Sequence, residues 1–310
     1  MRTDGVSVAR RLIAIVNAAA GDEGKRALAD ELMPVFAEHG FDARLVMTGG
    51  GSEIESAARD AVNAEPDIIV AGGGDGTINA VAARVAGTGI ALGVLPLGTL
   101  NHFAKALRLP LDPRLAAEVV ATGNTAAVDV GEVNGKIFLN NSSLGLYPRL
   151  VQRREQQQEQ LGRGKWPAAL WAAITLLRLH PVLHVRLTVN GQCINRRAAV
   201  VFIGNNVYSM SGLSIGERER LDCGQLSLFV THRNGRSGLL TLALRALFGR
   251  LRGAAGLDAL VTEAIEIESR HKRLPVSIDG EVVSLDAPLS YRIRPGALTV
   301  IVGAAPAGSA

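Results

Sequence analysis

A run of three glycines followed by Asp-Gly-Thr occupies residues 72–77, between an apolar segment and a helical pattern. Glycine lets the backbone approach a ligand closely, since any Cβ would collide with it. Free N–H groups at the start of the following helix favour phosphate oxygens. The structural alternative is a tight strand-to-helix turn with an incidental Asp75, and the glycine run makes it the weaker one. We predict a phosphate-binding loop in which Asp75 meets Mg²⁺ or a hydroxyl group.

Three other patterns suggest chemistry but lack something that it requires. Residues 19–26 approximate a Walker A loop without its first Gly and its final Ser or Thr. The glycines at 49–51 lack the spacing of a dinucleotide fingerprint, so we interpret them as a turn near the nucleotide. His180 and His184 are four residues apart, but Pro181 and the strand pattern after it argue against a helical metal pair.

The first half of the chain alternates short apolar segments with Ala-rich amphipathic ones. This pattern predicts a parallel sheet covered by helices on both faces, with ligands beyond the carboxyl ends of its strands. Ser52 and Glu55 predict a capping box at the start of the second helix. The expected strands are 12–17, 43–48, 67–71 and 90–96, and the expected helices are 26–39, 52–63 and 78–86.

The second half predicts mostly antiparallel sheet, because it contains three turn dipeptides between apolar runs. Asn134-Gly135 separates 127–133 from 136–141, Asn190-Gly191 follows 184–189 with 198–203 beyond it, and Asp279-Gly280 separates 276–278 from 281–284. Two helical insertions are expected at 146–179 and 237–252. The change of pattern places a domain boundary near residues 122–126.

Composition limits the partners and the compartment. The net charge of +4 over 310 residues suits an anionic partner such as ATP or an acidic membrane surface, and there is no Lys/Arg run to indicate nucleic acid. The two cysteines are expected to be reduced thiols of a cytosolic protein. The longest apolar stretch, 168–177, is about half of what a bilayer span needs. Any membrane contact is therefore expected to be peripheral.

Residues 73–77 and 96–104 (Pro-Leu-Gly-Thr-Leu-Asn-His-Phe-Ala) together resemble the diacylglycerol kinase catalytic family. This family includes sphingosine kinases and bacterial lipid kinases, and is more distantly similar to NAD kinases and phosphofructokinases. The resemblance extends over nearly the whole chain, because further matching segments follow in order at 140–145, 204–206, 221–226 and 278–281. The order and spacing of the segments are more specific than any one of them.

The resemblance implies a fold and a set of site residues. The fold would be an N-terminal three-layer α/β nucleotide-binding domain (1–125, which the segment 297–310 could complete) and a C-terminal antiparallel β-sandwich domain for the lipid (126–296), with the active site in the cleft between them. The implied cofactors are ATP and Mg²⁺, and the proton acceptor falls on Glu281. Carried over residue by residue, the nucleotide contacts fall on Thr48, Gly73, Gly74, Asp75, Gly76, Thr77, Ile78, Asn79 and Thr99.

The chain also departs from the family pattern. Asn101-His102 stands where the family usually has Asn-Asp, and residues 17–21 lack the usual Pro and Ser. The Asp-Asp-Gly motif that holds a structural Mg²⁺ in bacterial members reads Asp222-Cys223-Gly224 here. A thiol suits the hard Mg²⁺ ion poorly, so the accessory metal is expected to be absent or held through Asp222.

We therefore expect a lipid kinase that transfers the γ-phosphoryl group of ATP to a diacylglycerol-like or sphingoid hydroxyl. The basic apolar segments 165–178 and 237–252 could rest on an anionic membrane, or could simply pack on the sandwich. One alternative is an NAD kinase-like enzyme, against which residues 98–104 argue. Another is a non-catalytic regulator that binds ATP or lipid, against which Asp75 and Glu281 argue. The sequence leaves the oligomeric state open, a homodimer included.

Overall fold

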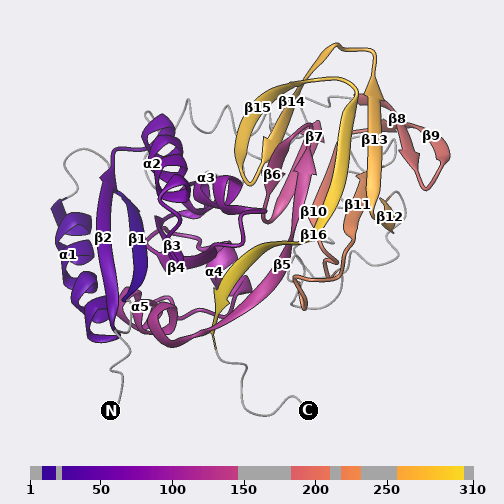
Figure 1. Cartoon of the computed structure of the whole chain (residues 1–310). Coiled ribbons are helices and arrows are strands. Elements are labelled where there is room, and N and C mark those ends of the chain that lie inside the picture. The colour runs from indigo at the N-terminus through magenta and orange to yellow at the C-terminus, as the bar shows by residue number, and fades with distance from the viewer. Residues whose placement is uncertain (1–8, 19–22, 146–182, 210–217, 232–256, 304–310) are drawn as a thin grey trace, which may run out of the picture. The chain divides into compact units, whose positions relative to one another are not determined.

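The computed structural model describes residues 9–18, 23–145, 183–209, 218–231 and 257–303 (Figure 1). These residues fall into two compact units. The chain passes from the first unit to the second between Val128 and Asp129, and returns to the first between Pro295 and Gly296. The two helical insertions expected at 146–179 and 237–252 lie outside the described residues.

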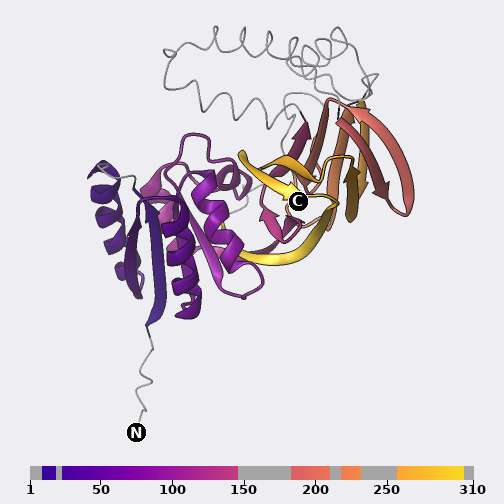
Figure 2. The same ribbon diagram turned by 90° about the horizontal axis from the view of Figure 1, so that it is seen from above.

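The N-terminal unit is a parallel sheet with helices on both faces, as the sequence predicts (Figure 2). The strand order is β2-β1-β3-β4, and the final residues of β16 extend it, with Val300 pairing in parallel with Leu92. Helix α1 packs with α5, and α2 packs with α3. The strands are β1 (Arg10–Asn17), β2 (Phe41–Thr48), β3 (Ile68–Gly73), β4 (Ala91–Pro96) and β16 (Leu289–Val302), and the helices are α1 (Glu23–Glu38), α2 (Gly51–Asn63), α3 (Asp75–Val85), α4 (His102–Ala106) and α5 (Pro113–Thr122).

Strands β3 and β4 form the centre of this unit. Every residue of both strands is buried, which is typical of parallel strands covered on two faces. Gly93 lets α5 lie close to β4, because a Cβ at that position would come within 2.8 Å of Val120. The segments expected as 67–71 and 90–96 are confirmed as these two strands.

The predicted capping box at Ser52 and Glu55 is wrong. Helix α2 begins at Gly51, its N-cap is Gly50, and no side chain caps it. Gly50 has a φ of 117°, a conformation that favours glycine and lets the helix begin a residue earlier than expected. The Oε2 atom of Glu53 instead accepts a hydrogen bond of 2.6 Å from the N–H of Gly49.

The C-terminal unit is an antiparallel β-sandwich, also as predicted. One sheet has the order β12-β11-β10-β7-β14-β15, and the other contains β16-β13-β8-β9 with the β5–β6 hairpin beside β16. Leu187 and Ile267 of one sheet share a hydrophobic core with Ile203 and Val276 of the other. The strands are β5 (Asn124–Val133), β6 (Lys136–Phe138), β7 (Asn141–Gly145), β8 (Leu183–Val189), β9 (Gln192–Ala198), β10 (Val200–Asn205), β11 (Leu226–Thr231), β12 (Leu257–Thr262), β13 (Ala264–Ser269), β14 (Arg273–Ile278) and β15 (Glu281–Asp286).

All three predicted turn dipeptides form hairpins. Both residues of each pair have positive φ. The angles are 46° and 81° for Asn134-Gly135, 50° and 76° for Asn190-Gly191, and 46° and 95° for Asp279-Gly280. These values fit the type I′ turn that Asn-Gly and Asp-Gly favour. One pairing differs from the expectation, because the partner of β8 is β9 and not the segment 198–203. The chain passes to the other sheet between Ala198 and Val200.

Candidate active site

The predicted nucleotide residues of the N-terminal unit lie at one edge of its sheet. Thr48 is the last residue of β2, Gly73 is the last residue of β3, and Thr99 follows β4. Because parallel strands end at the same edge, the fold brings these three segments together. Helix α3 begins at this edge, directly after the glycine loop.

The start of α3 is open to a ligand. Gly74 is its N-cap, with φ −84° and ψ −179°, and no side chain caps the helix. The N–H groups of Asp75, Gly76 and Thr77 begin the helix, and such groups lack intrahelical partners. Ile78 is fully buried and its N–H bonds to the Gly74 carbonyl, so its side chain belongs to the core. This local structure suits phosphate oxygens.

Two buried amide oxygens near this loop lack hydrogen-bond donors. Asn17 donates from Nδ2 to the Thr77 hydroxyl at 3.1 Å, but its Oδ1 accepts no bond among the described residues. The Oδ1 atom of Asn79 is also buried and accepts no hydrogen bond among the described residues. A buried acceptor without a donor destabilises the protein unless a ligand or water supplies one. ATP fits this edge, because it offers phosphate oxygens to the helix and hydroxyl and amino groups to these acceptors.

The loop after β4 is held by Asn101, which precedes the departure from the family pattern at His102. Asn101 is buried with φ 51°, accepts the N–H of Gly98 at 3.0 Å, and donates to the Gly98 carbonyl at 2.9 Å. The backbones at Gly98 and Gly74 approach so closely that a Cβ on Gly98 would lie 2.4 Å from the Gly74 Cα. The Asn101 contacts therefore hold Thr99, which is exposed, beside the glycine loop.

Asp75 already has one structural partner. Its Oδ1 atom accepts a hydrogen bond of 3.2 Å from the N–H of Phe103, near the start of α4. His102 precedes Phe103 and is exposed. The second carboxylate oxygen of Asp75 is the one that could contact a metal ion bound with the nucleotide.

In the sandwich unit, Glu281 is the exposed first residue of β15. The preceding turn is anchored by Asp279, which is partly buried and accepts three backbone N–H groups. The donors are Leu139 at 2.7 Å, Asn140 at 2.8 Å and Asn141 at 2.9 Å. The N–H of Asp279 in turn donates to the Asn141 carbonyl at 2.9 Å. Sequence analysis identified Asp279 only as a turn residue and missed this anchoring role.

Arg218 extends this partly buried polar network, and no sequence pattern pointed to it. Its guanidinium group donates to the Leu139 carbonyl at 2.6 Å and to the Asn140 Oδ1 at 2.7 Å. Asn205 donates to the same Leu139 carbonyl at 2.9 Å. Three of the segments that carried the family resemblance, 140–145, 204–206 and 278–281, thus meet around one set of hydrogen bonds.

Burial raises the pKa of Asp279 to about 6, although the three N–H donors and the positive charge of Arg218 oppose this shift. The geometry is compatible with a proton. Oδ1 accepts two of the three bonds and Oδ2 accepts one, so a proton on Oδ2 leaves all three in place.

This shift predicts a pH-dependent stability. The folded chain holds the Asp279 proton more tightly than the unfolded chain, whose pKa is near 3.8. The stabilisation from this proton is therefore present below about pH 4 and is lost as the pH rises through 6. Relative to Asp279→Asn, which cannot titrate, the parent should lose about 3 kcal/mol of unfolding free energy over that interval. Urea unfolding at each pH measures the difference, and a constant difference would show that folding does not shift the pKa of Asp279.

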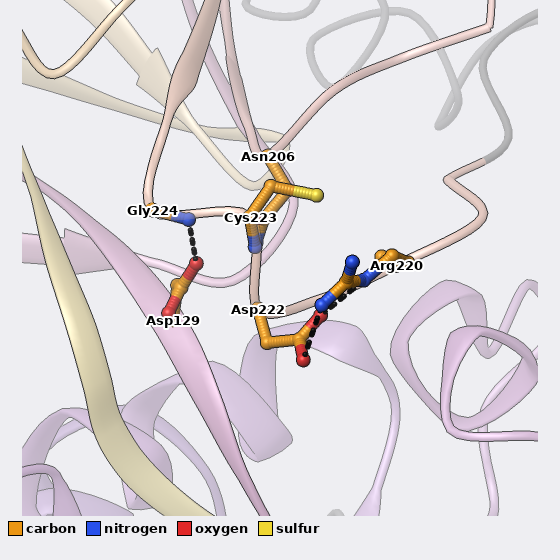
Figure 3. Close-up of polar contacts among 6 residues, drawn as sticks. All are labelled: Asp129, Asn206, Arg220, Asp222, Cys223 and Gly224. Carbon is orange, nitrogen blue, oxygen red and sulfur yellow. Dashed lines mark hydrogen bonds and ion pairs between the residues drawn. The ribbon is translucent and has the colours of Figure 1, made fainter.

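The residues near Asp222 do not fit the accessory Mg²⁺. Arg220 binds both oxygens of the Asp222 carboxylate, at 2.9 Å and 3.1 Å, and this ion pair lowers the pKa of Asp222 (Figure 3). The N–H of Cys223 donates to the Asn206 Oδ1 at 2.8 Å. Across the described ranges, no group of three His, Cys, Asp or Glu side chains could hold a metal. Protein contacts therefore hold this loop.

We expect the thermal stability of the nucleotide-free protein to be independent of Mg²⁺. A ligand that binds only the folded state raises the melting temperature, so Mg²⁺ in place of EDTA should leave it unchanged. Cys223→Asp, which restores the Asp-Asp-Gly motif, is the matched variant for a gain of Mg²⁺-dependent stability. Loss of stability in EDTA, restored by Mg²⁺, would contradict the expectation for the parent chain.

Comparison with known proteins places the chain in a family. It matches the diacylglycerol kinase catalytic domain over residues 11–133 and the YegS C-terminal NAD kinase beta sandwich-like domain over residues 147–302. The chain belongs to the diacylglycerol kinase catalytic domain family of lipid kinases, as the sequence motifs indicated. Among the described residues, no helix is both long and apolar enough to cross a bilayer.

Particular relatives cover nearly the whole chain. A Pseudomonas aeruginosa protein named "Probable lipid kinase YegS-like" is 31% identical over 92% of this chain and 93% of its own length. A "Diacylglycerol kinase" of Staphylococcus carnosus is 25% identical over 88% of this chain and 89% of its own length. In fold, the chain resembles a crystal structure of a diacylglycerol kinase from Bacillus anthracis, with a TM-score of 0.73, 24% identity, and coverage of 96% of this chain and 99% of that one.

Proposed function

We propose that this protein is an ATP-dependent lipid kinase that phosphorylates the hydroxyl group of a diacylglycerol-like or sphingoid lipid. The observation that carries the proposal is the uncapped start of α3 at Gly74, beside buried acceptors that lack donors. Membership of a lipid kinase family supports a lipid as the molecule that receives the phosphoryl group. Since such a lipid lies in a membrane, the proposal includes peripheral contact with an anionic membrane surface.

The N-terminal unit would hold the nucleotide. Backbone N–H groups of Gly76 and Thr77 would bind phosphate oxygens, and Thr48, Asn79 and Thr99 would line the same edge. Mg²⁺ bound with ATP would neutralise part of the negative charge of the phosphates. Asp75 would hold that ion through the oxygen that does not bond to Phe103.

The sandwich unit would supply the proton acceptor. Glu281 is exposed, and the anchored turn at Asp279 restricts the position of its backbone. A carboxylate in this role would take the proton of the lipid hydroxyl as that oxygen bonds to the γ-phosphorus and the bond from the γ-phosphorus to ADP breaks. Incubation with labelled ATP and a total lipid extract, followed by identification of the labelled product, tests the function directly. ATP binding without a labelled lipid would favour the regulator that the altered Asp222-Cys223-Gly224 motif suggests.

Gly74→Ala should separate nucleotide binding from folding. An added Cβ would meet only the Gly98 Cα at 3.6 Å, an ordinary contact, so the fold should persist. The methyl group should keep phosphate away from the start of α3 and weaken Mg²⁺·ATP binding by about tenfold or more, or ~1.4 kcal/mol, in calorimetric titration. Gly73→Ala is the contrasting variant, because its Cβ would lie 2.6 Å from Thr77 and should destabilise the fold. Parental affinity in folded Gly74→Ala would refute the site.

Glu281→Gln should separate chemistry from binding. The amide keeps nearly the same shape but cannot take a proton at neutral pH. We expect kcat for lipid phosphorylation to fall by at least ~10²-fold, with ATP affinity close to parental. Glu266→Gln, at another exposed glutamate of the sandwich, is the control and should be neutral. A parental rate in Glu281→Gln would make this residue an ordinary hairpin glutamate.

A further inference from the structure

The sandwich unit carries a cluster of exposed basic residues that the proposed chemistry does not use. His184 and Arg186 belong to β8, Arg197 belongs to β9, and Arg270 and Lys272 follow β13. All five side chains are exposed. We call these five residues the basic surface. In Figure 1 their strands lie side by side, as the pairing of β8 with β9 and β13 requires.

Strand register places three of these residues on one face of the sheet. His184 lies directly opposite Arg197, and Arg186 lies opposite Asn195 on one side and Glu268 on the other. Residues that pair directly across strands share a face. A cavity of about 550 Å³ opens here, and its lining includes His184, Arg186, Asn195, Arg196, Arg197 and Arg270.

The carboxylates nearby neutralise only part of this charge. Arg186 lies 3.7 Å from Glu268, and both side chains are about half exposed, so solvent weakens the pair. Arg197, Arg270 and Lys272 form no ion pair within the described part of the chain. Neighbouring like charges repel one another. An anionic partner would remove that repulsion.

We infer that the basic surface docks the protein on an anionic membrane. The inference rests on the proposed function, because a lipid hydroxyl must be reached at a membrane. Guanidinium groups match the planar, bidentate recognition of phosphate. Separate cations spread over a sheet face suit many headgroups, and each Lys or Arg near such a surface contributes a factor of about five in binding. The described residues that line the cavity include no Phe, Tyr or Trp, side chains on which nucleic-acid bases stack.

The test is cosedimentation of the full chain with vesicles of phosphatidylcholine alone or mixed equally with phosphatidylglycerol. The parent should bind the mixed vesicles, and added salt should weaken this binding by screening. The triple variant Arg197→Glu, Arg270→Glu, Lys272→Glu should bind them at least ~100-fold more weakly, as the loss of three cations implies. The matched control makes the same charge change at exposed residues elsewhere: Arg26→Glu, Arg59→Glu, Lys136→Glu. Its binding should remain well above that of the first variant.

Several results would overturn the inference. Equal loss in both triple variants would assign binding to net charge, and parental binding in the first variant would exclude these residues. Binding to a single-stranded RNA that the first variant loses, with no vesicle binding by the parent, would assign the surface to nucleic acid. The proposed function is tested separately with a short-chain diacylglycerol in detergent. Vesicle binding without any lipid phosphorylation would refute the kinase and leave the basic surface standing.

Discussion

The candidate site of the N-terminal unit depends on the close approach of two backbones at Gly74 and Gly98. The register of β3 and β4, in which Gly73 pairs with Pro96, brings the two loops to the same sheet edge. No Cβ separates them, and Asn101 ties its own loop to Gly98 through paired hydrogen bonds. The open start of α3 and the exposed Thr99 therefore belong to one rigid arrangement.

The partly buried carboxylate of Asp279 has the corresponding role in the sandwich unit. Burial of Asp279 would destabilise the fold by several kcal/mol if the charge had no partners. Three backbone N–H groups and Arg218 offset only part of that cost, since the pKa stays raised, and the same bonds attach the β14–β15 turn to residues 139–141. Any backbone shift would break bonds that leave donors buried, so the turn before Glu281 has little freedom.

Local chemistry explains what the sequence predicted well. Strands β1 to β4 and the three hairpin turns follow from apolar runs and from dipeptides that tolerate positive φ. The predictions that failed depended on contacts between distant residues or on a choice between competing hydrogen bonds. Glu53 bonds to Gly49 where a capping box was expected, and β8 pairs with β9 because the chain changes sheets after Ala198. Arg218 was missed because its partners Leu139 and Asn140 lie 79 and 78 residues away in the sequence, and no periodicity records such contacts.

Arginine does three different physical tasks in the sandwich unit. Arg218 is part of a buried network, where its five fixed donors satisfy several carbonyl groups. Arg220 neutralises Asp222 with a charge that is permanent at any physiological pH, so the loop at Cys223 needs no metal ion for that purpose. Arg197 instead has no carboxylate partner among the described residues. That exposed charge is therefore open to an external anion, as the inferred membrane docking requires.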